Sequence, residues 1–226
     1  MPMNIAIDGP VGAGKSSIAD QVAQRLHILH LDTGAMYRTV ALYMLRNGID
    51  PQDEQTVSAR CGEADVRVAY RDGAQRTMLG GEDVSDLIRT GEVSAAASAI
   101  SKWPAVRRRM VAAQREIAAT ADMLIDGRDI GTRVLIDAPV KIFLTATPEE
   151  RARRRYQEMV NKGMDANFDD VLRDLRARDE QDTHRAVDPL RAAEDAVTVD
   201  STHLTFDEVV EAILRIVADK TGGAWA

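Results

Sequence analysis

Short apolar runs alternate with helical periodicities along this 226-residue chain. The run Asn4 to Asp8 precedes a glycine cluster, a pattern typical of a buried parallel strand. Apolar residues then recur at helical spacing from Ile18 to Leu26, so the chain is expected to begin with a strand, a loop and a helix. A second helix is predicted to begin with Thr33 as its N-cap and to end at Asn47-Gly48. The same patterns predict further strands at 30–32, 123–126, 140–144 and 197–200, and further helices at 91–103, 104–121, 148–162, 169–181 and 206–220.

Residues 65–86 have a different character from the rest of the chain. Val66, Val68 and Tyr70 alternate with charged residues, and Asp72-Gly73 is a typical hairpin turn before the returning strand. We therefore expect a small antiparallel β element inserted in an α/β chain. Elsewhere the alternation of strands and helices predicts a parallel sheet flanked by helices, with ligands at the carboxyl ends of its strands. The tail at 221–226 is expected to fray.

Composition narrows the possible classes of protein. The net charge of −7 disfavours a bulk nucleic-acid binder. Of the 29 basic residues, five are lysines and 24 are arginines, and arginine is the residue that binds phosphate through two parallel hydrogen bonds. No apolar run is long enough to span a membrane, and the amino terminus lacks the pattern of a secretory signal. Cys61 is the only cysteine, which excludes an intrachain disulfide and suits a reducing compartment. We expect a cytoplasmic protein in which Cys61 is an incidental small apolar residue.

The glycine cluster fits the phosphate-binding pattern G-x-x-x-x-G-K-[ST] and lies between a predicted strand and a predicted helix. Such a loop wraps its N–H groups around phosphates at the start of a helix. Lys15 is expected to reach the β- and γ-phosphates of a nucleotide, and the Ser16 hydroxyl to bind Mg²⁺. The residues predicted to bind the nucleotide are Gly9, Pro10, Val11, Gly12, Ala13, Gly14, Lys15, Ser16 and Ser17.

Three classes of nucleotide-binding protein are compatible with this loop. A GTPase would carry N-K-x-D, but Asn161-Lys162-Gly163 is followed by Met164. A motor or AAA-type ATPase needs a longer chain. A small-molecule kinase fits the length best.

A second motif follows the predicted strand at 123–126. Asp126 either supports Mg²⁺, as in other proteins with this loop, or caps the next turn, and the sequence leaves both roles open. In the continuation Gly127-Arg128-Asp129-Ile130-Gly131-Thr132, an arginine suited to phosphate stands beside an aspartate suited to a polar ligand edge. A solvated surface ion pair is the alternative.

Taken together, these segments resemble the bacterial cytidylate (CMP) kinases, from about residue 4 to residue 220. The segments that carry the resemblance are residues 7–17, 31–38, 125–132, 141–144, 149–152 and 178–187. The resemblance implies a nucleoside-monophosphate kinase fold, with a P-loop core at 1–32 and 122–226, an NMP-binding insertion at 33–121 and a lid at about 153–165. Gly163 is either a hinge of that lid or a helix C-cap.

The resemblance also implies ATP-dependent phosphorylation of CMP and dCMP with Mg²⁺, by a monomer that binds no nucleic acid or membrane. It places Ser98, Arg107 and Asp129 at the cytosine, Arg38 and Arg128 near the CMP phosphate, and Asp182 at the ribose. Arg178 and Arg185 would lie beside the phosphates, and Thr33 and Tyr37 would also bind substrate. Lys15, Arg128 and Arg185 are the expected catalytic residues. The predicted helix at 148–162 carries four arginines, which are Arg151, Arg153, Arg154 and Arg155. They span more than one face of the helix, so only some of them would point inward and offset charge at the transferring group.

Alternatives remain from the sequence alone. A kinase for UMP or a small alcohol is the nearest one, and a regulatory nucleotide-binding module or an arginine-rich RNA-binding protein belongs to a different class. The acidic net charge and the lack of an aromatic RNA-binding motif disfavour the last.

Overall fold

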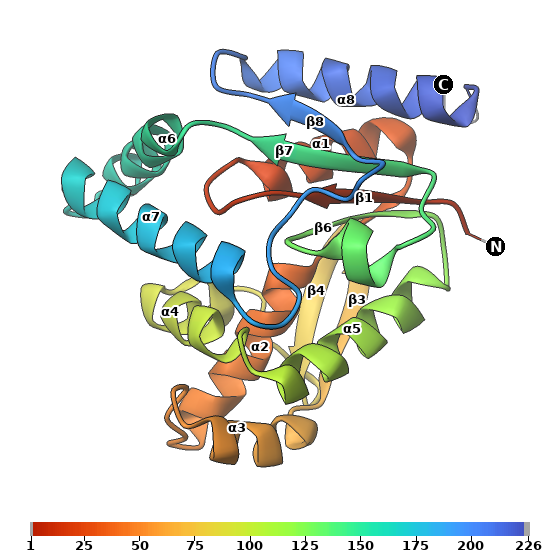
Figure 1. Ribbon diagram of the computed structural model, residues 1–226. Coiled ribbons are helices and arrows are strands. Elements are labelled where there is room, and N and C mark those ends of the chain that lie inside the picture. The colour runs from red at the N-terminus through yellow and green to blue at the C-terminus, as the bar shows by residue number, and fades with distance from the viewer. Residues whose placement is uncertain (1, 224–226) are drawn as a thin grey trace. The chain divides into compact units, whose positions relative to one another are not determined.

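The computed structural model describes residues 2–223, which form two compact units (Figure 1). The first unit consists mainly of Leu29–Met123. The second combines Met3–Ile28 with the chain from Leu124 onward, so the glycine loop and the carboxyl-terminal half of the chain belong together.

A parallel sheet forms the centre of the second unit. The strands of this sheet that belong to the second unit lie in the order β6 (Met123–Gly127), β1 (Asn4–Asp8), β7 (Val140–Thr145) and β8 (Val197–Asp200). Strand β1 pairs in parallel with β7, and β7 pairs in parallel with β8. All five residues of β1 are buried, as its unbroken apolar run predicts. The predicted parallel sheet is therefore confirmed.

Helices α1 (Lys15–Leu26) and α8 (Phe206–Thr221) supply the apolar side chains that cover this sheet. Val22 of α1 and Ile213 of α8 are fully buried in one core with Ile7 of β1. Two further helices, α6 (Pro148–Asn161) and α7 (Phe168–His184), pack against each other through a separate cluster. Figure 1 shows α8 running alongside β8, and α6 beside α7.

The first unit contains the remaining helices and a three-stranded antiparallel sheet. Its elements are β2 (Leu29–Asp32), α2 (Thr33–Arg46), α3 (Glu54–Arg60), β3 (Val66–Arg71), β4 (Ala74–Leu79), β5 (Glu82–Asp83), α4 (Gly91–Ile100) and α5 (Pro104–Ala118). Strands β3 and β4 form the predicted hairpin, and positive φ angles at Asp72 (53°) and Gly73 (77°) make its turn. Three short helical turns, at Cys61–Glu63, Leu87–Arg89 and Ile130–Val134, complete the two units.

One predicted helix cap is wrong. Asp32, not Thr33, is the N-cap of α2: its backbone is extended, and its carboxylate accepts the N–H of Ala35 at 2.9 Å. Thr33 is already helical and therefore lies one residue too late to cap. Helix α3 and strand β5 were not predicted because they are too short to show a period. The tail was predicted to fray over 221–226: Thr221 belongs instead to α8, and residues 224–226 lie outside the described part of the chain.

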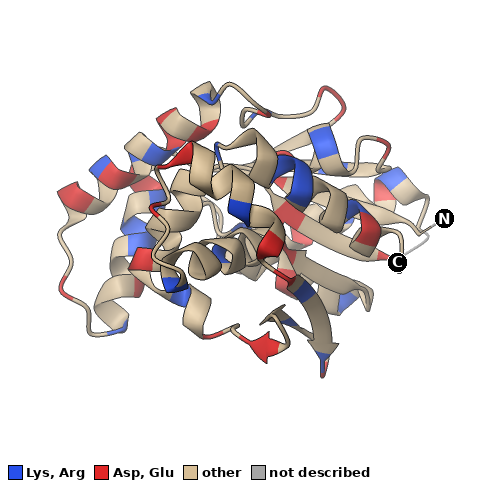
Figure 2. Cartoon of the chain, turned by 90° about the horizontal axis from the view of Figure 1, so that it is seen from below, with Lys and Arg blue, Asp and Glu red and all other residues tan. Residues whose placement is uncertain are grey.

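Acidic and basic residues alternate along the helices (Figure 2). Many arginines of α6 and α7 pair with a carboxylate one turn away, as Arg155 does with Glu158 and Arg173 with Asp170. Such exposed pairs add little stability. Within residues 2–223, no helix combines the length and the apolar character needed to cross a membrane.

Candidate active site

The glycine loop joins the end of β1 to the start of α1. Gly9 has a φ of 153°, and a β-carbon there would overlap the carbonyl oxygen of Leu144, so no other residue fits. Gly14 is the N-cap of α1 and provides no side-chain acceptor. The first N–H groups of α1 are consequently left for a ligand, at the positive end of the helix dipole. This is the arrangement that binds phosphate.

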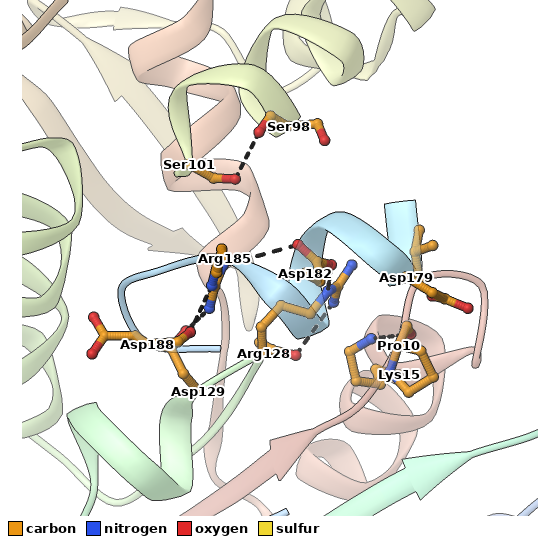
Figure 3. Close-up of polar contacts among 12 residues, drawn as sticks. Pro10, Lys15, Ser98, Ser101, Arg128, Asp129, Asp179, Asp182, Arg185 and Asp188 are labelled. Carbon is orange, nitrogen blue, oxygen red and sulfur yellow. Dashed lines mark hydrogen bonds and ion pairs between the residues drawn. The ribbon is translucent and has the colours of Figure 1, made fainter. Parts of the chain in front are cut away.

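Lys15 is 5% exposed and donates from Nζ to the carbonyl of Pro10 at 2.8 Å (Figure 3). Burial, reinforced by the charge of Arg128, lowers the pKa of the Lys15 ammonium to about 7. A carbonyl is a weaker partner for an ammonium than an anion is. A phosphate in the loop would therefore be a better partner for Lys15 than Pro10.

Ser16 Oγ donates to Asp126 Oδ2 at 2.9 Å, joining the glycine loop to the end of β6. Asp126 is 4% exposed and is not the N-cap of the turn that follows, which is Asp129. Hydroxyl and carboxylate oxygens are ligands that suit Mg²⁺. No group of three or more potential ligands among His, Cys, Asp and Glu occurs within residues 2–223. A magnesium ion here would depend on phosphate and water oxygens for its remaining ligands.

Four of the predicted residues form one charged cluster in the second unit (Figure 3). Arg128 Nε donates to Asp182 Oδ2 at 2.9 Å, and Arg185 Nη2 donates to Asp129 Oδ1 at 3.3 Å. Arg185 Nη1 also lies 3.9 Å from Asp182 Oδ1. The side chains of Arg185 and Asp129 are only 4% and 8% exposed. The cluster joins the segment after β6 to the end of α7, two places that are 54 residues apart in the chain.

Asp188 is part of this cluster and was missed from the sequence. Its carbonyl accepts Arg185 Nε at 2.6 Å, and its carboxylate pairs with Arg133 at 2.5 Å. Asp188 has a φ of 50°, in the left-handed region, so the chain after α7 turns sharply at this residue. No local sequence pattern indicates such a contact.

Asp8, the last residue of β1, was also missed. It is 4% exposed, and its two carboxylate oxygens accept the N–H groups of Ile130 at 2.7 Å and Gly131 at 2.8 Å. Burial raises the pKa of the Asp8 carboxyl to about 6. An aspartate at the end of an otherwise apolar strand is the one sequence signal that could have drawn attention to it.

The arginines of α6 have different partners. Arg151 is 3% exposed and donates to the carbonyls of Ala146 and Val11 and to both oxygens of Asp179. Arg154 donates to the carbonyl of Ser201 at 2.6 Å. The other two arginines of the predicted set, Arg153 and Arg155, are exposed and pair with neighbouring glutamates. Only Arg151 reaches the glycine loop, through a backbone carbonyl.

The remaining substrate residues lie in the first unit. Arg38 Nη2 donates to Asp32 Oδ2 at 2.8 Å, whereas its buried Nε has no hydrogen-bond partner among the described residues. Arg107 is 2% exposed, donates to the carbonyl of Ser101 at 3.2 Å and lies over the ring of Tyr37. Arg38 therefore keeps one donor available, and Arg107 is fixed in place before any ligand binds.

For the remaining residues singled out from the sequence, the structure shows mainly burial or a local contact. Thr33 is buried, and the carbonyl of Ser98 accepts the hydroxyl of Ser101 at 2.9 Å. The guanidinium of Arg178, on α7, forms no hydrogen bond or ion pair within residues 2–223 and can therefore bind a ligand. Cys61 is buried, and burial raises the pKa of its thiol, which argues against a nucleophile.

A phosphate-binding loop between a buried strand and a helix, with Lys15 and Ser16 at its end, defines a P-loop nucleotide-binding protein. A gluconokinase from Sinorhizobium meliloti 1021 shares this fold, with a TM-score of 0.50 and 15% identity over 98% of this chain and 95% of that one. The sequence profile of the family described as cytidylate kinase matches residues 5–219, so the chain belongs to the cytidylate kinase family.

Curated relatives agree with this membership. A cytidylate kinase from Mycobacterium leprae is 48% identical over 98% of both chains. Another, from Caldicellulosiruptor bescii, is 47% identical over 95% of both chains. These matches run nearly the full length of this chain and of its relatives, and the family profile, over residues 5–219, includes both the glycine loop and the charged cluster.

Proposed function

We propose that this enzyme transfers the γ-phosphoryl group of ATP to CMP and dCMP, with Mg²⁺, giving ADP and CDP or dCDP. The observation that carries the proposal is the charged cluster in the same unit as the glycine loop. Its two guanidiniums suit phosphates, and its two carboxylates suit sugar hydroxyls and the amine of a base. Membership of the cytidylate kinase family supports the choice of cytosine.

On the donor side, the loop N–H groups and Lys15 bind the phosphates of ATP. Transfer of a phosphoryl group proceeds through a loose transition state, so positioning and neutralisation of charge do most of the catalytic work. Ser16 would hold Mg²⁺ through its hydroxyl oxygen, while the hydroxyl donates a hydrogen bond to Asp126. When bound, that ion neutralises charge on the phosphate oxygens and orients them.

On the acceptor side, Arg128 and Arg38 bind the CMP phosphate, and Asp182 accepts the ribose hydroxyls. Arg178 and Arg185 stabilise the charge of the transferring group. The attacking atom is an ionised phosphate oxygen of CMP, so the reaction needs no protein nucleophile or general base. None of the four histidines is therefore a catalytic candidate.

Base selection is assigned to three residues. Asp129 accepts a hydrogen bond from the cytosine amine, Arg107 donates to acceptors of the base, and Ser98 contacts its edge. The buried, prearranged side chain of Arg107 supports this role, because a fixed donor discriminates between bases better than a mobile one.

We assign residues 33–121 to acceptor binding, the remainder of the chain to a P-loop core, and residues 153–165 to a lid whose closure excludes water. Gly163 has a φ of 71° and its N–H bonds the carbonyl of Val160, so in this structure it ends α6. A hinge at Gly163 remains part of the proposal. We further propose a cytoplasmic monomer whose partners are ATP and CMP or dCMP.

One assay tests the function: ADP formation from ATP, with and without CMP, dCMP, UMP or a small alcohol. We expect turnover that depends on CMP or dCMP and is weak with UMP. Equal use of UMP, or use of a small alcohol alone, would contradict the cytosine assignment. Turnover that needs no acceptor would indicate a regulatory nucleotide-binding protein instead.

A further inference from the structure

Asp8 holds the start of the helical turn Ile130–Val134 from a distant strand. The first N–H groups of any helical turn lack partners within the turn. Here the N–H groups of Ile130 and Gly131 both donate to the Asp8 carboxylate, at 2.7 and 2.8 Å. A β-carbon at Gly131 would be in van der Waals contact with Asp8 Oδ2, at 3.4 Å.

The residue in the N-cap position of this turn is Asp129. An aspartate at an N-cap ordinarily accepts the N–H groups of its own helix. The Asp129 side chain makes no such bond. Its Oδ1 lies instead 3.3 Å from Arg185 Nη2, inside the charged cluster.

We propose that Asp8 is a positioning residue for base recognition: by capping the turn in place of Asp129, it keeps the Asp129 carboxylate available to cytosine. This inference rests on the proposed function. Without the Asp8 carboxylate, Asp129 would turn toward the unpaired N–H groups beside it. The base would then lose the acceptor that distinguishes its amine from the carbonyl of uracil.

The Asp8 carboxyl is buried and costly to ionise in the folded protein, which agrees with a functional role. No cation forms an ion pair with the Asp8 carboxylate among the described residues, and its burial raises its pKa to about 6 despite the two N–H bonds. The ionisable groups around it are Lys15 of α1, Asp129 before the turn, and Lys141 of β7, whose stem also packs at Gly131. A buried carboxylate that is costly to ionise is more readily understood as a functional device than as a stabilising one.

The test compares Asp8→Asn with a matched control, Asp200→Asn. Asp200 also accepts a backbone N–H, that of Thr202 at 2.9 Å, but it is exposed. An asparagine at position 8 keeps the shape but can accept through one oxygen only, and its amide group would oppose the second N–H. We expect the ratio of kcat/KM for CMP to that for UMP to fall about 10-fold in Asp8→Asn, with ATP affinity within about twofold of wild type. The ratio should not change in Asp200→Asn.

Amide hydrogen exchange gives a readout independent of activity. At least one of the amides of Ile130 and Gly131, the one left facing the asparagine amide group, should exchange about 10-fold faster in Asp8→Asn than in wild type if Asp8 caps them. Absence of CMP-dependent turnover in the wild type would refute the proposed function, and unchanged exchange would refute the cap. These two failures are therefore distinguishable.

The wild-type protein provides a third measurement that needs no variant. Protonation of Asp8 below pH 6 should lower the CMP-to-UMP ratio several-fold between pH 8 and pH 5, and the ratio cancels the shared ionisation of the nucleotide phosphate. The same ratio should stay constant with pH in Asp8→Asn. If the ratio of kcat/KM for CMP to that for UMP at pH 8 is the same in Asp8→Asn as in wild type, with or without a loss of ATP affinity, the proposal is overturned.

Discussion

The hydroxyl of Ser16 donates to Asp126 Oδ2 across 2.9 Å, linking two residues that are 110 positions apart in the chain. This contact bears on the role of Asp126, which the sequence left open between Mg²⁺ and a helix cap. Asp129 occupies the N-cap position of the following turn, and the first N–H groups of that turn, those of Ile130 and Gly131, bond Asp8, so Asp126 has no part in the cap. The carboxylate of Asp126 thus remains directed at the residue that we expect to bind the metal.

We therefore expect Asp126→Asn to weaken the response to Mg²⁺. The Mg²⁺ concentration for half-maximal activity should rise by roughly 10-fold, the lower end of what loss of such an outer partner costs a metal site. The measurement is a Mg²⁺ titration of CMP phosphorylation at saturating ATP. Asp219→Asn, which changes an exposed carboxylate on α8, is the control. Identical titration curves for the two variants would contradict the assignment.

Lys15→Ala should lower kcat by roughly 10²- to 10³-fold or more, because one positioned donor of charge is lost from the transition state. Burial of Lys15 makes the loss severe, since water does not readily replace it. Steady-state kinetics measure the effect, and thermal unfolding confirms that the variant is folded. A variant that keeps a tenth of the wild-type activity would rule out this role for Lys15.

Asp182→Ala and Arg185→Ala should weaken the binding of CMP far more than the binding of ATP. The two residues lie one helical turn apart, and both belong to the charged cluster proposed to bind the acceptor. We expect KM for CMP to rise about 10-fold or more, with KM for ATP nearly unchanged. Asp174→Ala, an exposed carboxylate on the same helix, is the control. An equal rise in KM for CMP and for ATP would indicate a folding defect or a role on the donor side.

Asp129→Asn should narrow the preference for CMP over UMP. The carboxylate of Asp129 accepts from the cytosine amine but would oppose the uracil carbonyl, whereas an amide can turn and donate to it. Arg107, which can only donate, would likewise oppose the uracil N3–H, and two such mismatches at about 1–3 kcal/mol each predict a wild-type preference of very roughly 10² or more. The measurement is kcat/KM for both nucleotides on wild type, Asp129→Asn and the exposed control Asp137→Asn. If wild type uses UMP as well as CMP, Asp129 does not read the base.

The raised pKa of Asp8 makes stability depend on pH in a definite direction. The folded protein holds the Asp8 proton up to about pH 6 and the unfolded chain only up to about 3.8, so this group contributes stability at low pH that is lost as pH rises through 6. The free energy of unfolding of wild type minus that of Asp8→Asn should therefore fall by about 1 kcal/mol from pH 5 to pH 7. Urea unfolding at several pH values measures this difference. In Asp200→Asn, where the carboxylate has a lowered pKa, the difference should be flat over that range.

The sequence by itself determined the elements and the nucleotide loop. An unbroken apolar run, glycines and a 3.6-residue period are local patterns, so β1, the loop and α1 could be predicted from short-range rules. The hairpin at Asp72-Gly73 was predicted for the same reason. Segments shorter than two turns or without alternation, such as α3 and β5, carry no period and were missed.

Only the tertiary structure decided which side chains meet. Asp8 bonds the backbone of residues 122 and 123 positions further on, and Arg185 meets Asp129 across 56 positions. Of the four arginines at 151–155, the sequence did not show which face inward; in the structure Arg151 is buried against the carbonyl of Val11 and Asp179. Side-chain partners of this kind depend on how strands and helices pack, and a charged residue shows no trace of its distant partner in its own neighbourhood of the chain.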